Sequence, residues 1–194
     1  MRSYIDYQAA KPVDKRVLEE MLPYFNDKFA NPSSLHRDGD IATDTLEKSR
    51  EMVAKFINAP NASDIIFTAS ATESNNLAMI GAAKNRKKKG DHIIISEIEH
   101  ISILNLGKHL ERQGFKVSRV PVDQYGIIRL DKLERLITDK TILVSIASAS
   151  NEVGSLQPIK EISEIAKDKK ILFHTDAVAS ESTIPIDVQK TPID

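Results

Sequence analysis

The chain has 194 residues with 27 basic and 28 acidic side chains, a formal net charge of −1 that argues against nucleic acid or an acidic membrane surface as a partner. It contains no cysteine, so disulfides and an all-cysteine metal site are excluded within these residues. No run is apolar enough for a signal peptide or a membrane span, and we expect a cytoplasmic protein.

Two helical patterns occupy the first third of the chain. Apolar residues recur at helical spacing after Asp14, a residue type that caps helices, and this predicts a helix over residues 14–25. A longer amphipathic pattern predicts a second helix over residues 41–57. The turn-rich segment NPSS separates the two.

From residue 64 onward, strand and helix patterns alternate. Strands are expected over 64–70, 92–97, 115–122, 141–149 and 171–177, and helices over 71–88, 100–113, 131–138 and 159–169. Several of the strands are almost continuous apolar runs, which is typical of a parallel sheet covered on both faces. The sequence therefore predicts an α/β fold, a three-layer αβα arrangement around a mostly parallel sheet.

In such a fold, ligands bind beyond the carboxyl ends of the strands, and polar residues follow four of the predicted strands. Ser70 and Glu73 have the spacing of a capping box, which favours a structural role for this turn. The same strand-to-helix turn could instead present backbone N–H groups and the Thr72 hydroxyl to a phosphate. A dinucleotide site is disfavoured because no G-x-G-x-x-G motif occurs.

The other three strand ends carry His100, Asn151 and Asp176. A histidine at a helix start most often caps or packs, but its position at a strand end favours a place in a cavity. Asn151 lies in a loop that could be a simple turn or could place an amide beside a ligand. Asp176 ends a buried strand, where a carboxylate is costly unless a positive group meets it. The histidines show no metal-ligand spacing, and we expect no metal site.

Taken in order, these segments resemble the pyridoxal-phosphate enzymes of fold type I, and most closely the cysteine desulfurases of the class V aminotransferase group. The resemblance runs over nearly the whole chain, through YIDYQAAKPVD, NPSS, IIFTASATESNNLAMIGAA, HIIISEIEH, TILVSIASASNEVGSLQPI and FHTDAVAS. It implies an N-terminal arm over residues 1–13. It further implies that residues 14–194 are the front part of the cofactor-binding large domain.

The resemblance also implies a role for each candidate residue. Ala71 and Thr72 would hold the phosphate of pyridoxal 5'-phosphate, and His100 would stack on the pyridine ring and take part in proton transfer. Asn151 would lie beside the ring oxygen and the substrate carboxylate. Asp176 would pair with the protonated pyridine nitrogen, because each charge favours the ionised form of the other.

Several positions depart from the family pattern. Ala10 and Lys11 replace a Thr-Thr pair, Ser70 replaces a glycine, and Ala179 replaces a glutamine that bonds the ring hydroxyl. The Ser-x-His-Lys stretch with the covalent lysine, the small C-terminal domain and the cysteine-bearing loop are not among these residues. We therefore expect a truncated large domain that is inactive by itself.

The expected activity of the complete enzyme is conversion of L-cysteine to L-alanine and an enzyme-bound persulfide for iron–sulfur cluster assembly or thiolation. The expected partners are an iron–sulfur scaffold or other sulfur acceptor, and a second copy in a homodimer or a separate C-terminal half. Two alternatives stay open. One is a non-catalytic remnant or split-gene subunit that acts as a scaffold, and the other is a relative resembling selenocysteine lyase. A nucleotide-binding module is disfavoured.

Overall fold

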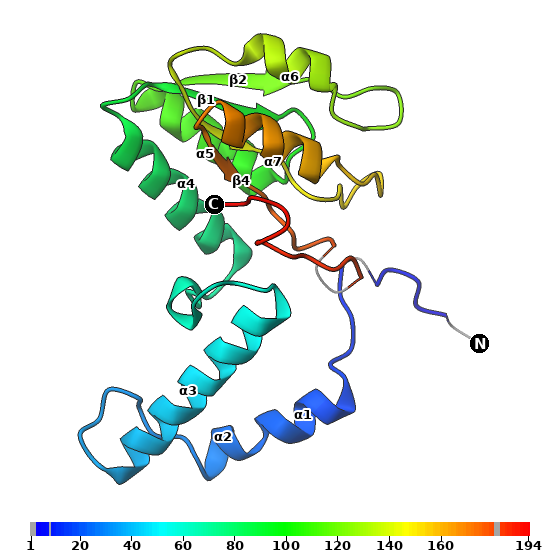
Figure 1. Ribbon diagram of the computed structural model, residues 1–194. Coiled ribbons are helices and arrows are strands. Elements are labelled where there is room, and N and C mark those ends of the chain that lie inside the picture. Colours follow the sequence, from blue (N-terminus) through cyan, green and yellow to red (C-terminus); the bar gives the residue numbers. More distant parts are fainter. Residues whose placement is uncertain (1–2, 8, 181–182) are drawn as a thin grey trace. The chain divides into compact units, whose positions relative to one another are not determined.

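The computed structural model describes residues 3–7, 9–180 and 183–194 (Figure 1). The chain divides into two compact units, residues 1–66 and 67–194. The first is helical and the second contains the sheet. Among the residues described, no helix is both long and apolar enough to cross a membrane.

The helix predicted over residues 14–25 is two short helices, α1 (Lys15–Met21) and α2 (Pro23–Asn26). Asp14 caps α1 as expected, and its Oδ1 accepts a hydrogen bond from the Arg16 amide at 2.9 Å. Pro23 has no amide hydrogen to continue α1, and it occupies the first turn of α2 instead. The prediction of one continuous helix was wrong for this reason.

The second predicted helix is α3 (Arg37–Phe56), which begins four residues earlier than the apolar pattern. His36 caps it, with Nδ1 accepting from the Gly39 amide at 3.3 Å. Within the described part of the first unit only Gly39 and Ala54 are buried, while Phe25 and Phe29 are more than half exposed. The helices of this unit therefore form without a sizeable core of their own.

The strand predicted over residues 64–70 does not form. The 3-10 helix η1 (Ala62–Asp64) takes its start, and the remainder belongs to no sheet in the described chain. Ile66 and Phe67 are 67% and 46% exposed. The apolar run did not decide the outcome, because an extended segment becomes a strand only where another strand pairs with it.

The second unit is built on four parallel strands: β1 (His92–Ser96), β2 (Lys116–Val120), β3 (Thr141–Ser145) and β4 (Leu172–His174). Their spatial order is β2-β1-β3-β4. Helix α4 (Ala71–Arg86) precedes β1, and α5 (Ile101–Arg112), α6 (Leu130–Leu136) and α7 (Ile159–Asp168) connect successive strands. From α4 onward the predicted alternation is confirmed, with strands shorter than the apolar runs.

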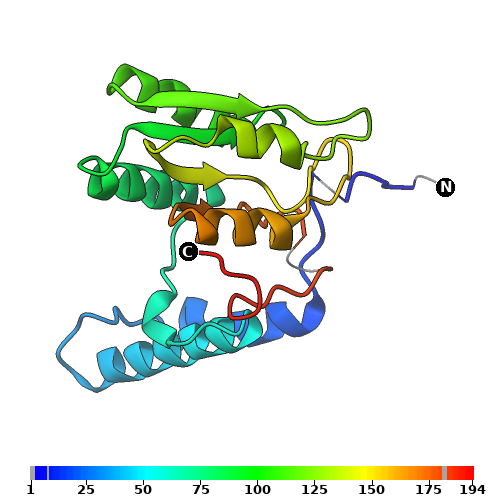
Figure 2. The same cartoon turned by 45° about the horizontal axis from the view of Figure 1, so that its top comes forward.

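The central strands β1 and β3 are buried at every residue, and successive side chains of a strand point to opposite faces of the sheet. Ile93 and Ile95 of β1 pack with residues of α4 and α5, whereas Ile94 packs with residues of α6 and α7. Figure 2 shows the sheet with helices on both of its faces. The three-layer αβα prediction is confirmed for this unit. All four strands run the same way, so their carboxyl ends lie at one edge.

Candidate functional site

Asp176 lies just beyond the carboxyl end of β4, and neutral donors meet its carboxylate. Oδ2 accepts from Asn75 Nδ2 at 2.9 Å, and Oδ1 accepts from the Val178 amide at 3.1 Å. The main-chain carbonyl accepts from the Ser148 amide, which extends the ladder between β3 and β4. None of the ion pairs found among the described residues includes Asp176. The carboxylate is therefore held in place without a cation.

Asn75 joins Asp176 to the start of α5. It is a buried residue of α4, 3% exposed, and its Nδ2 also lies 3.2 Å from Ser102 Oγ. Ser102 Oγ in turn lies 2.8 Å from His100 Nδ1. Two of the predicted site residues, Asp176 and His100, are thus connected through two hydrogen-bonded side chains that sequence reasoning did not single out.

His100 is the N-cap of α5 and also faces outward. Its Nδ1 accepts from the Ser102 amide at 3.2 Å, which is the capping role expected of a histidine at a helix start. The side chain is nevertheless exposed, and within the described chain no hydrogen bond involves Nε2. One ring nitrogen therefore serves the fold while the other is available to a ligand.

The first turn of α4 has the predicted capping interactions. Ser70 Oγ accepts from the Glu73 amide at 3.2 Å, and Glu73 Oε2 accepts from the Ala69 amide at 2.7 Å. The Ala71 and Thr72 amides find no acceptor in the part of the chain that the structure describes, and both residues are exposed. Because residues three or four apart share a helix face, these amides lie one turn from Asn75.

Asn151 is not brought into this group by any contact of the described chain. Its amide donates to Glu152 Oε1 at 3.2 Å. Ser150 Oγ accepts from the Glu152 and Val153 amides, both at 3.3 Å, and Gly154 has a φ of 74°. These are the features of a local turn, and the role of Asn151 as a ligand contact stays a prediction.

Glu99 is a second acid at the same edge of the sheet, and unlike the partly exposed Asp176 it is buried. It is 5% exposed; Oε1 accepts from the Ala147 amide at 2.8 Å, and Oε2 has no partner among the described residues. Burial, reinforced by the nearby charge of Asp176, raises the pKa of Glu99 to about 8. Glu99 therefore carries a proton at neutral pH.

His174 completes the cluster of titratable groups around Asp176. Its Nδ1 lies 2.9 Å from Ser145 Oγ. Burial lowers the pKa of His174 to about 4, although the charge of Asp176 acts in the opposite direction. At neutral pH both Glu99 and His174 are therefore uncharged.

Asn75, Ser102 and Glu99 are the functional candidates that sequence reasoning missed. Asn75 could have been found as a polar residue one turn after Thr72, on the face of α4 that packs toward the sheet. Ser102 and Glu99 flank His100, but only the tertiary structure shows what their side chains contact. Among the described residues, no cluster of three or more metal-ligating side chains occurs.

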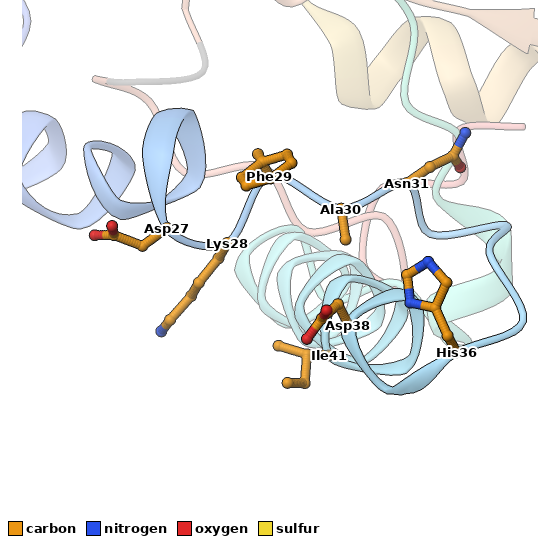
Figure 3. Close-up of a pocket in the computed structure, with 8 residues that line it drawn as sticks. All are labelled: Asp27, Lys28, Phe29, Ala30, Asn31, His36, Asp38 and Ile41. Carbon is orange, nitrogen blue, oxygen red and sulfur yellow. The ribbon is translucent and has the colours of Figure 1, made fainter.

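A separate cavity lies wholly within the first unit, with a volume of about 360 Å³. Figure 3 shows its lining, which comes from the segment after α2 and the start of α3. His36 lines it, but the ring is already engaged in capping α3. None of the predicted site residues lines this cavity.

The chain matches the model of one protein family, aminotransferase class-V, over residues 3–194. It is 49% identical to cysteine desulfurase IscS 1 of Archaeoglobus fulgidus over 191 residues, which are 98% of this chain and 50% of that protein. It is 46% identical to cysteine desulfurase IscS of Clostridium botulinum, with 98% and 48% covered. The chain thus spans about half the length of the curated relatives it matches.

Solved structures give the same picture. A NifS-like protein superposes on the whole of this chain with a TM-score of 0.96 and 42% identity, and 53% of that protein is covered. A structure described as SspA in complex with cysteine has a TM-score of 0.94 and 40% identity, with 100% of this chain and 55% of that protein covered.

Proposed function

The chain belongs to the class V aminotransferase family, and on that premise we propose that it forms the front half of a pyridoxal-phosphate-dependent cysteine desulfurase. The proposed reaction of the complete enzyme converts L-cysteine to L-alanine and retains the sulfur as a persulfide. The relatives named cysteine desulfurase support this proposal, and so does the likeness to a protein solved in complex with cysteine.

The observation that carries the proposal is the environment of Asp176. Its carboxylate accepts two hydrogen bonds from neutral donors and, among the described residues, has no cationic partner. A carboxylate has about four acceptor positions, so it can accept a further N–H. A protonated pyridine nitrogen would supply both that donor and the missing positive charge.

The other residues around Asp176 also fit the cofactor. The unpaired Ala71 and Thr72 amides stand at the positive end of α4, where an anionic phosphate is favoured. The exposed His100 ring offers a flat surface for stacking and one nitrogen, Nε2, for proton transfer. When bound, pyridoxal phosphate supplies an electron sink for bond breaking at the substrate α-carbon.

The chain itself supplies binding and orientation rather than the sulfur-accepting group. Asp176 would hold the ring nitrogen, Thr72 and Ala71 the phosphate, and His100 a proton at Nε2. No cysteine is present in these 194 residues, so the thiolate that takes the sulfur must come from elsewhere. Ala179 is exposed and has no group to bond the ring hydroxyl, so that contact would be missing.

The proposal also includes the assembly of the enzyme and the acceptor of its sulfur. Pairing with a separate C-terminal half would place the missing lysine and cysteine beside this site, whereas a second copy of this chain adds no cysteine. The proposed setting is the cytoplasm, with a homodimer as the proposed assembly of the complete enzyme. An iron–sulfur scaffold or another acceptor would then receive the sulfur. A purely scaffolding role would be recognised by the absence of cofactor binding in the experiment below.

The test is a calorimetric titration of the 194-residue chain with pyridoxal 5'-phosphate, with pyridoxal as the matched ligand that lacks the phosphate. We expect binding of the phosphate form and much weaker binding of pyridoxal. Borohydride reduction followed by mass spectrometry should label no single lysine specifically. Absence of binding by the folded chain would contradict the proposal and favour the scaffolding role, while specific labelling of one lysine would show that the covalent residue is present after all.

A further inference from the structure

We propose that Asn75 and Ser102 are positioning residues that couple the Asp176 carboxylate to His100 and hold the imidazole in the tautomer protonated on Nε2. The tautomer follows from contacts within this chain. Its consequence for proton transfer rests on the proposed function.

The direction of each hydrogen bond can be worked out from the Asp176 end. An ionised carboxylate only accepts, so the Asn75 side-chain atom 2.9 Å from Oδ2 must be the amide nitrogen. That nitrogen has two hydrogens, and the second is directed at Ser102 Oγ, 3.2 Å away. Ser102 Oγ is therefore an acceptor toward Asn75.

Ser102 then determines the state of His100. With its oxygen accepting from Asn75, the hydroxyl hydrogen is available for His100 Nδ1 at 2.8 Å. The Ser102 amide donates to the same nitrogen at 3.2 Å. Because Nδ1 faces two donors, it cannot carry the proton of the neutral ring, and the proton resides on Nε2.

Burial explains why these contacts can act as a unit. Asn75 is 3% exposed, so leaving its amide without partners would cost far more than at the surface. It comes from α4, His100 and Ser102 come from the start of α5, and Asp176 follows β4. The orientation of the exposed His100 ring is thus tied to a buried group on another helix. Any proton that His100 gives or takes passes through Nε2.

The first test needs no cofactor. Histidine side chains labelled with ¹⁵N are observed by NMR in the whole 194-residue chain at about pH 9, where imidazoles are neutral. In the parent chain we expect His100 Nδ1 to resonate as an unprotonated nitrogen and Nε2 as a protonated one. His36 is an internal reference, because its Nδ1 accepts only a backbone N–H. A proton on Nδ1 of His100 would overturn the inference.

Variants then test the coupling. Asn75→Leu removes both amide donors without touching His100, and Ser102→Ala removes the hydroxyl. Both should move the two His100 nitrogen signals toward each other, whereas Ser102→Thr should retain the parent positions. Asn76→Leu is the matched control, since the Asn76 amide donates to the Thr72 carbonyl of its own helix. Identical His100 signals in Asn75→Leu, Asn76→Leu and the parent would refute the coupling.

A second variant and a cofactor titration complete the experiment. If Asn75→Leu does not fold, Ser102→Ala decides, because Ser102 is partly exposed and alanine is a better helix former. Titration with pyridoxal phosphate runs in parallel, and we expect Asn75→Leu to weaken binding roughly fivefold, the equivalent of about one hydrogen bond. If His100 has its proton on Nε2 but the chain does not bind pyridoxal phosphate, only the proposed function is overturned. If the chain binds pyridoxal phosphate but His100 has its proton on Nδ1, only this inference is overturned.

Discussion

Asn75 Nδ2 lies 2.9 Å from Asp176 Oδ2, although 101 positions separate the two residues in the sequence. The first turns of α4 and the end of β4 meet at this hydrogen bond. It answers the question of how the fold accommodates a carboxylate at the end of a buried strand. The Asn75 side-chain amide and the Val178 backbone N–H donate to the two carboxylate oxygens of Asp176. Among the described residues no cation pairs with this carboxylate, so a positively charged ligand could.

Asp176→Ala should abolish or strongly weaken the binding of pyridoxal phosphate. Removing one member of a buried charge pair typically costs ~3–5 kcal/mol, because the other charge is left uncompensated. Calorimetric titration of parent and variant measures the difference. Asp131→Asn, which breaks an exposed pair with Arg129, is the control and should bind like the parent. If Asp176→Ala and Asp131→Asn bound pyridoxal phosphate with equal affinity, Asp176 would not be a cofactor-binding residue.

Glu99 should make the protein less stable as the pH rises. Its folded pKa of about 8 lies above the ordinary value of 4.5, so over this interval the folded chain retains a proton that the unfolded chain releases. Between pH 6.5 and 8 the free energy of unfolding should fall by about 1 kcal/mol per pH unit.

Below pH 6.5, His174 should oppose Glu99. Its folded pKa of about 4 lies below the ordinary 6.5, so the unfolded chain binds the extra proton and stability is lost on acidification. The two slopes should largely cancel between pH 4.5 and 6.5. Urea unfolding at a series of pH values checks this profile.

Glu99→Gln should remove the decline above pH 6.5. Glu97→Gln is the matched control, because Glu97 is exposed and its side chain accepts a hydrogen bond from the Val122 amide. It should retain the parent profile. A decline that persists unchanged in Glu99→Gln would show that another group titrates.

Shortening an isoleucine side chain to alanine should destabilise the protein at a buried position of α7 but not in the segment before α4. Ile162 is fully buried in the cluster under α6 and α7, whereas Ile66 is 67% exposed. Ile162→Ala should lower the free energy of unfolding by ~2–5 kcal/mol, and Ile66→Ala by less than about 1 kcal/mol. Denaturant unfolding of both variants measures this. A large loss for Ile66→Ala would mean that its side chain is covered in solution.

Two glycines should respond in opposite ways to alanine. A Cβ at Gly90 would lie 2.1 Å from the Lys140 carbonyl oxygen, a backbone atom that cannot move without disturbing the start of β1 and β3. A Cβ at Gly81 on α4 would meet nothing within 4 Å. We expect Gly90→Ala to be strongly destabilising and Gly81→Ala to stabilise by about 1 kcal/mol. The midpoint temperatures of thermal unfolding measure both effects. A Gly90→Ala variant at least as stable as Gly81→Ala would contradict the prediction for Gly90.

The elements that sequence patterns predicted well are those whose apolar residues find partners within the chain. The four strands of the sheet and the helices packed on it belong to this class, and the burial of β1 on both faces follows from the uninterrupted run Ile93 to Ile95. The segment over residues 64–70 had an equally good pattern and failed. Pairing, and not the pattern, decides whether a strand forms, and no described strand pairs with it.

The candidate site shows the same limit. Asp176 and His100 were predicted from their positions after strands, and the structure connects them through Asn75 and Ser102. The first turn of α4 was predicted to follow a strand that does not form. Asn151 was predicted by the same rule, and in the described chain it makes only local contacts. The rule identifies the edge of the sheet but not the direction in which each side chain points.

By itself the sequence determined the αβα layering and the edge at which chemistry is expected, because side-chain periodicity and strand ends are local properties. Only the tertiary structure decided that an amide meets Asp176, that a serine hydroxyl meets His100, and that Glu99 is buried with a proton. Those results depend on contacts between α4, α5 and the strand ends. Hydrogen-bond directions and desolvation are set by neighbours in space, which periodicity does not encode.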